Sequence, residues 1–162
     1  TMENKNFTGS HAQKAENYFK SGYTCAQSVL LAFEDLTHID SGTAFAMAAP
    51  FGGGVARMRD LCGAVSGMLM VAGILYAPKR PMNHEEKTNF YKLCQSLVQT
   101  FREKNASIVC RELLGETGTS ITYIPEERTE EYYQKRPCAG LAASAAAILD
   151  DYLSQNPPAS LI

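Results

Sequence analysis

The sequence predicts an all-α protein, a single-domain helical bundle of about six or seven helices around a central apolar helix at 61–77. Three observations point to this fold: helix-capping residues recur along the chain, apolar residues follow them at helical spacing, and strand signals are scarce. The chain has 162 residues, of which 45% are hydrophobic and 20% are charged. These values are typical of one folded globular domain and not of a disordered chain.

The first three helices are predicted from their start and stop residues. Ser10 can cap a first helix, which Gly22 ends, because glycine tolerates the left-handed conformation of a helix terminus. Thr24 and Gln27 form a capping-box pattern for a second helix. A short third helix is expected at 41–49, before a run of three glycines that is too costly in entropy to be helical.

The later helices are predicted in the same way, from capping residues and the spacing of apolar residues. The apolar stretch 61–77 is shorter than the about 20 residues of a membrane-spanning helix, so a buried central helix is predicted. Asn83 and Glu86 form the next capping box, ahead of an apolar stripe that runs to Phe101. Two further helices are expected, at 107–115 and at 137–153.

The remaining segments are polar. Residues 116–136 are rich in glutamate and are predicted to form a long surface loop, in which 121–124 is the one candidate strand. Residues 1–9 are expected to be a flexible N-terminus and 154–162 a tail.

Charge and cysteine content narrow the class of protein. The formal net charge is −2 and basic residues form no stripe, so no nucleic acid partner is expected. The chain opens without a signal peptide, and neither secretion nor membrane insertion is predicted; the expected location is cytoplasmic. Five cysteines are present, and cytoplasmic thiols stay reduced unless they are catalytic or bind metal.

Four of the five cysteines fall in the first turn of a predicted helix: Cys25, Cys62, Cys110 and Cys138. There, unpaired backbone N–H groups and the helix dipole stabilise a thiolate, which lowers its pKa from about 8.5. A thiolate is both the nucleophile of disulfide exchange and a ligand for soft metals. The alternative is that these cysteines pack as small hydrophobic residues, and Cys94, within an apolar stripe, is predicted to do so.

Nearby cations strengthen the prediction of reactive thiols. Basic residues adjoin three of these cysteines, namely Arg57, Arg59, Arg111, Lys135 and Arg136. The three histidines, His11, His38 and His84, have no partner at metal-ligand spacing and are predicted to lie on the surface.

Cysteine spacing excludes several known motifs. No Cys-x-x-Cys is present, which excludes thioredoxin-like motifs, zinc ribbons and attached c-type haem. A shared site must therefore be assembled by packing distant helix starts together. Glycine has no side chain and so lets the backbone come close to such a site. The candidate cofactor-binding residues are therefore Gly52, Gly53, Gly54, Gly63 and Gly67. A tight turn explains the first three as well, and close helix packing explains the last two.

The order of these motifs resembles the Cys-Gly-Ala-x-x-Gly family of redox-active proteins (C_GCAxxG_C_C type) over about residues 12–150. The residues that match are Gly22-Tyr23-Thr24-Cys25-Ala26-Gln27-Ser28-Val29, Phe51-Gly52-Gly53-Gly54, Cys62-Gly63-Ala64-Val65-Ser66-Gly67, Cys110-Arg111-Glu112-Leu113 and Cys138. The resemblance implies that these four cysteines are the functional ones, whereas Cys94 has no counterpart. It also implies a role near membrane transporters. The pattern is more distantly similar to split-Soret cytochromes, which implies an iron–sulfur cluster, although their haem motif is missing here.

Three functional hypotheses follow. Paired thiols could cycle between dithiol and disulfide. Alternatively, Cys25, Cys62, Cys110 and Cys138 could hold a metal such as Zn, or an iron–sulfur cluster. In the third hypothesis the chain is a non-enzymatic accessory protein of a membrane transporter, and its cysteines are structural. The expected partners are a redox protein or that transporter, and a homodimer is a further expectation.

Overall fold

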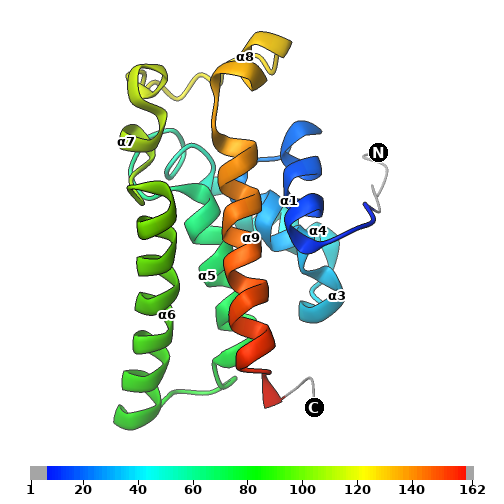
Figure 1. Cartoon of the computed structure of the whole chain (residues 1–162), viewed down its shortest axis with the longest axis vertical. Coiled ribbons are helices and arrows are strands. Elements are labelled where there is room, and N and C mark those ends of the chain that lie inside the picture. The colour runs from blue at the N-terminus through cyan, green and yellow to red at the C-terminus, as the bar shows by residue number, and fades with distance from the viewer. Residues whose placement is uncertain (1–6, 160–162) are drawn as a thin grey trace.

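The computed structural model describes residues 7–159, and all of the regular secondary structure in this part of the chain is helical (Figure 1). The helices are α1 (His11–Lys20), α2 (Cys25–Ala32), α3 (Glu34–Thr37), α4 (Ser41–Ala48), α5 (Gly63–Tyr76), α6 (His84–Asn105), α7 (Cys110–Leu114), α8 (Glu130–Lys135) and α9 (Cys138–Gln155). Two 3₁₀ turns, Ala49–Phe51 and Gly115–Gly118, follow α4 and α7. The predicted all-α fold is confirmed.

Capping explains where the main helices begin. Ser10 accepts a hydrogen bond from the backbone N–H of Gln13, whose side chain in turn accepts one from the backbone N–H of Ser10. The same reciprocal pair joins Thr24 with Gln27 at α2, and Asn83 with Glu86 at α6. Because each pair satisfies two otherwise unpaired N–H groups, these helices start where the sequence predicts.

The core lies where α2 meets α5 and α9. All eight residues of α2 are buried, so this short helix is enclosed more completely than the predicted central helix α5. The last helix, α9, packs against α1, α2, α5 and α6, and its buried alanines let these neighbours approach closely. Figure 1 shows α6 and α9 running along the long axis, with α1 on the far side of α9 from α6.

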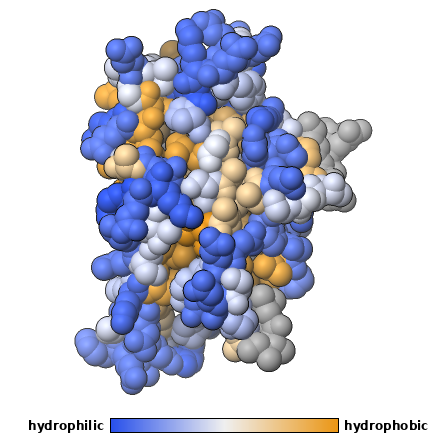
Figure 2. All heavy atoms as spheres, viewed as in Figure 1, coloured by the Kyte–Doolittle hydropathy of each residue, from blue (hydrophilic) through white to orange (hydrophobic). Residues whose placement is uncertain are grey.

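The distribution of polar and apolar side chains on the surface reflects the amphipathic character of the helices. In Figure 2, hydrophilic side chains cover α6 and the end of the molecule near α8, and hydrophobic atoms emerge between α6 and α9. No helix within residues 7–159 is long and apolar enough to cross a membrane.

The structure differs from the sequence predictions in three segments. The helix expected at 107–115 begins only at Cys110, because backbone hydrogen bonds from Cys62 to Ile108 and from Cys110 to Asp60 hold the intervening Val109 extended. The region 116–136 contains α8, and 121–124 forms no strand. The short helix α3 was not predicted. Of the expected N-terminus 1–9 and tail 154–162, residues 1–6 and 160–162 lie outside the described part.

One of the three histidines, His11, is partly buried and contacts side chains of other helices, which the sequence did not predict. His38 and His84 are exposed as predicted, but the His11 ring stacks on Phe33 with ring centroids 4.1 Å apart. Its Nδ1 lies 2.6 Å from Oδ1 of Asp150, and its Nε2 lies 3.0 Å from Oδ1 of Asp35. The hydrogen bond to Asp150 raises the pKa of His11, burial lowers it, and Asp35 raises it further, so that the net pKa is above 6.5. The ring thus links α1, α3 and α9.

This ring makes stability depend on pH. The pKa of His11 is higher in the folded state, so protonated His11 stabilises the fold fully below pH 6.5 and this contribution is lost as pH rises through the folded pKa. The free energy of unfolding of the wild type, compared with His11→Gln, is expected to differ most near about pH 5.5 and least near about pH 8. Urea titrations at both pH values measure this difference. A difference that grows with pH would contradict the assignment.

Candidate functional site

A cavity of about 330 Å³ lies where four helix starts meet, and all four predicted cysteines line it. Cys25, Cys110 and Cys138 are the first residues of α2, α7 and α9, and Cys62 immediately precedes α5. All four are buried. The predicted convergence of distant helix starts is therefore present, whereas Cys94 is only half-buried within α6 and does not line the cavity.

Backbone pairing aligns two of these helix starts. The N–H of Cys62 donates to the carbonyl of Ile108 at 2.8 Å, and the N–H of Cys110 donates to the carbonyl of Asp60 at 2.6 Å. Together with an antiparallel bridge between Leu61 and Val109, these bonds place the start of α7 beside that of α5.

Glycines allow the backbone to come close to two of the cysteines. A Cβ added at Gly54 would lie 2.5 Å from Cβ of Cys110, and one added at Gly63 would lie 3.1 Å from Cβ of Cys25. Gly52, Gly53, Gly54 and Gly63 line the cavity, but Gly67 does not. A Cβ at Gly67 would lie 2.7 Å from the carbonyl oxygen of Ala26. The position of Gly67 therefore indicates close helix packing and not a cofactor contact.

The chain after these glycines adopts an unusual left-handed course. Val55, Ala56, Arg57 and Arg59 have φ values of 63°, 48°, 66° and 63°. For residues with a side chain, this conformation costs about 1–2 kcal/mol each. Backbone hydrogen bonds hold it in place, among them Ala56 N–H to the carbonyl of Pro50 at 2.7 Å. Strain of this kind is typical of functional sites, and here it belongs to the loop that supplies two of the cavity's arginines.

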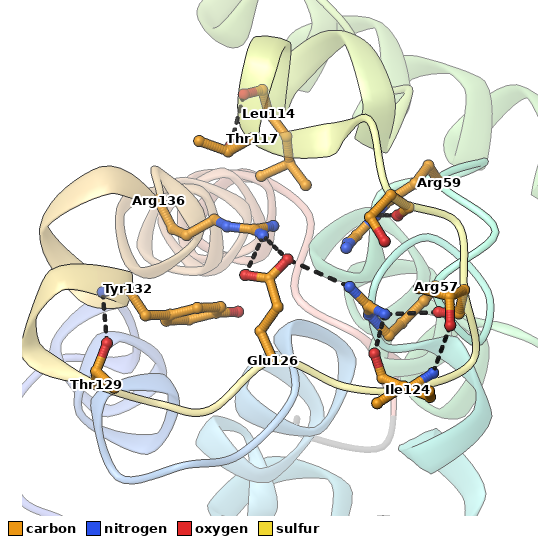
Figure 3. A network of polar contacts seen from close by, with 11 residues as sticks. Arg57, Arg59, Leu114, Thr117, Ile124, Glu126, Thr129, Tyr132 and Arg136 are labelled. Atoms are coloured by element: carbon orange, nitrogen blue, oxygen red, sulfur yellow. Dashed lines mark hydrogen bonds and ion pairs between the residues drawn. The ribbon is translucent and has the colours of Figure 1, made fainter.

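Four arginines and one carboxylate line the cavity within the described residues: Arg57, Arg59, Arg128, Arg136 and Glu126. Figure 3 shows Glu126 between Arg136 and Arg57. Its Oε1 lies 2.6 Å from Nη2 of Arg136 and 3.3 Å from Nη2 of Arg57. Two other cations predicted to act on the cysteines lie elsewhere, because Arg111 pairs with Asp60 and Lys135 with Glu131 on the surface.

The other two arginines have no carboxylate partner among the described residues. Arg59 donates from Nε to the carbonyl of Ser120 at 3.0 Å and also hydrogen-bonds to Cys110. The guanidinium of Arg128 lies over the rings of Phe19 and Tyr132, at 4.5 and 4.8 Å from their centroids. The cavity therefore contains more cationic than anionic side chains.

The segment 119–129 covers this cavity and is fixed to it by the arginines. Arg57 donates to the carbonyl of Thr122 at 2.6 Å and to that of Ile124, Arg59 holds Ser120, and Arg136 holds Glu126. The sequence indicated a surface loop here but gave no sign that Glu126 and Arg128 belong to the site. Polar residues in a loop of this kind are usually solvated, so their role emerges only from tertiary contacts.

The pKa of three of the four cysteines is raised, and for two of them burial is the largest cause. This corrects the expectation that every helix start lowers the pKa. Burial is the main cause that raises the pKa of Cys62 to about 12, although backbone N–H groups of Ala64 and Val65 act against it. Burial likewise raises the pKa of Cys110, despite its hydrogen bond with Arg59. Removing a charged group from water outweighs a few favourable dipoles at these positions.

The pKa of Cys138 is lowered, unlike that of the other three cysteines in the cavity. The Cys25 thiol hydrogen-bonds to the Cys138 sulfur, and this bond is the largest cause that lowers the pKa of Cys138. Burial opposes the shift, and Arg136, Arg128 and Arg59 add to it. The same bond, followed by burial, raises the pKa of Cys25 well above its ordinary value. Of the two sulfurs, Cys138 is therefore the one that loses its proton more readily, and Cys25 is the one that keeps it.

The cysteines do not fit a single metal ion in this arrangement. Cysteine sulfur suits Zn and iron–sulfur clusters, but within residues 7–159 no three cysteine, histidine or acidic side chains are placed to hold one ion.

Comparison with known families agrees with the cysteine pattern. A family model described as "Putative redox-active protein (C_GCAxxG_C_C)" matches residues 23–152. The chain belongs to the C_GCAxxG_C_C family. That name gives the central motif as Gly-Cys-Ala-x-x-Gly, whereas this member has Cys62-Gly63-Ala64-x-x-Gly67. No match was found among curated proteins or among solved structures.

Proposed function

We propose that this C_GCAxxG_C_C protein performs thiol–disulfide exchange, with Cys138 as the attacking thiolate and Cys25 as the resolving thiol. The single observation that supports this assignment is the hydrogen bond between the two sulfurs, in a cavity whose arginines favour the charge on Cys138. A thiolate next to a second thiol is the arrangement that disulfide exchange requires.

The reaction has two steps. The Cys138 thiolate attacks one sulfur of a substrate disulfide, and the other substrate sulfur leaves as a thiolate. Cys25 then attacks the Cys138 sulfur, forms the Cys25–Cys138 disulfide and releases the second substrate thiolate, which takes the proton of Cys25. The substrate gains two electrons and the protein loses two.

The Cys25–Cys138 pair is suited to the second step, in which Cys25 attacks the mixed disulfide. In the mixed disulfide, Cys138 no longer carries a charge, so the hydrogen bond that most raises the pKa of Cys25 is lost. Cys25 therefore ionises more readily once it is needed as a nucleophile. Return to the dithiol requires a dithiol-bearing partner protein, and we place the reaction in the cytoplasm, where thiols are kept reduced.

Disulfide mapping tests the pairing. Oxidation of the reduced protein with diamide is expected to give one main disulfide, Cys25–Cys138, because only these two sulfurs are hydrogen-bonded to each other. Peptide mass spectrometry after blocking the remaining thiols identifies the linked peptides. A main disulfide between Cys62 and Cys110 would contradict the assignment. Stoichiometric iron and sulfide in anaerobically purified protein would favour the cluster hypothesis instead.

A second candidate function is that of an accessory partner of a membrane transporter. The segment over the cavity exposes apolar side chains, with Tyr123 89% exposed and Ile121 and Ile124 67% and 64% exposed. Such side chains are suited to a protein contact. If this is the whole function, all five thiols are expected to react slowly with iodoacetamide at pH 7, and quickly only in denaturant.

A further inference from the structure

The cavity has a cationic excess that its own side chains do not neutralise. Arg57 and Arg136 share the carboxylate of Glu126. Arg59 and Arg128 have no carboxylate partner within residues 7–159, and a negative charge on Cys138 would compensate only one of them. Buried charges are costly unless they are paired, so this arrangement favours a ligand that brings negative charge.

The arginines are rigidly held and well placed for recognition. Arg59 is 3% exposed and Arg136 is 9% exposed. Arg128 lies over the rings of Phe19 and Tyr132 and donates hydrogen bonds to the backbone carbonyls of Phe19 and Tyr23. A guanidinium presents planar, paired N–H donors that match the oxygens of a carboxylate. The start of α9 adds the positive end of a helix dipole on the same side as Cys138.

The size of the cavity limits the ligand. A volume of about 330 Å³ is small for a binding pocket and accommodates a compact molecule but not a folded protein segment. The lining combines these arginines with apolar side chains such as Phe19, Leu114 and Leu141. A short apolar molecule with acidic ends matches both features.

We propose that the substrate of the Cys25–Cys138 pair is a small disulfide that carries carboxylate groups. This inference rests on the proposed function and names its substrate class. Arg59 and Arg128 bind the carboxylates and so hold the sulfur–sulfur bond beside Cys138. Exchange proceeds as described above: the substrate disulfide is reduced to two acidic thiols, and the protein dithiol is oxidised to the Cys25–Cys138 disulfide.

Three small disulfides that differ mainly in charge test this substrate class. They are 3,3′-dithiodipropionate (anionic), 2-hydroxyethyl disulfide (neutral) and cystamine (cationic). The reduced full-length protein is mixed with each, and intact-mass spectrometry follows its oxidation. Each rate is divided by the rate of the same disulfide with 2-mercaptoethanol, which removes differences in chemical reactivity. The anionic disulfide is expected to react at least about tenfold faster than the neutral one, and the cationic one more slowly than both.

Two arginine variants test whether the cavity causes the preference for the anionic disulfide. Arg59→Gln and Arg128→Gln are each expected to reduce the anionic-to-neutral rate ratio by about tenfold. Arg102→Gln is the matched control, because Arg102 lies on α6 outside the cavity, and its ratio should stay at the wild-type value. Circular dichroism checks that each variant is folded.

A non-reactive analogue keeps the test valid if a variant fails to fold. Suberate has the same chain length and carboxylates as 3,3′-dithiodipropionate but no disulfide, and it is expected to slow oxidation of the wild type by the anionic disulfide competitively. Equal normalised rates for all three disulfides, without inhibition by suberate, would overturn the substrate class and leave the proposed function intact. No reaction with any of the three would contradict the proposed function itself.

Discussion

Cys138→Ser is expected to lower the rate of disulfide reduction at pH 7 by at least about 100-fold, because it removes the sulfur that we propose to be the attacking one. Among the four cysteines in the cavity, only Cys138 has a lowered pKa, and the raised pKa values of the other three make them weaker replacements. The rate is measured as oxidation of the reduced protein by 2-hydroxyethyl disulfide, a neutral reagent whose binding does not depend on the arginines.

Three other serine variants complete this experiment. Cys94→Ser, outside the cavity, is expected to keep the wild-type rate. In Cys25→Ser, Cys138 should still attack the reagent, but the reaction should stop at the mixed disulfide. The mass of the protein then increases by that of one half of the reagent. Because the pKa of Cys62 is about 12, Cys62→Ser should slow exchange far less than Cys138→Ser does. If Cys62→Ser abolishes exchange while Cys138→Ser retains it, the roles assigned to the sulfurs are wrong.

Gly67→Ala is expected to destabilise the protein by about 2 kcal/mol, the scale of overpacking in a tight core. The new Cβ would lie 2.7 Å from the carbonyl oxygen of Ala26 and 2.9 Å from Cβ of Val29. Both contacts belong to the rigid helix α2, which cannot move without disturbing the core. Urea denaturation gives the change in the free energy of unfolding.

The same helix provides the control. Gly73 also lies in α5, but a Cβ there meets nothing within 4 Å. Gly73→Ala is therefore expected to leave stability unchanged or to raise it by up to about 1 kcal/mol, because alanine favours a helix more than glycine does. Equal effects of the two substitutions would show that α2 and α5 do not pack as closely as described.

The sequence predicted the fold well because the fold depends on local signals. The capping pairs at Ser10, Thr24 and Asn83 act within four residues of chain, and the apolar stretch 61–77 indicates a buried helix by itself. These signals also placed the four cysteines at helix starts, and so allowed their convergence to be predicted.

The chemistry of the site could not be predicted in the same way. Whether the pKa of a thiol rises or falls depends on how much water surrounds it, and Cys62 shows that burial can outweigh the helix dipole. The left-handed course of 53–57 and the position of Arg128 over Phe19 depend on contacts between distant segments. No local pattern in the sequence encodes either of them.

The positions of Cys25 and Cys138 in the chain determine when, during synthesis, the two residues can first meet. The two residues begin α2 and α9, so nearly all of the bundle emerges from the ribosome before the second of them. Because domains are made from the N-terminus onward, an incomplete chain contains Cys25 without the cysteine with which it is proposed to pair. A Cys25–Cys138 disulfide therefore cannot form in the incomplete chain, and α9 completes the core and brings the two cysteines together in the same step.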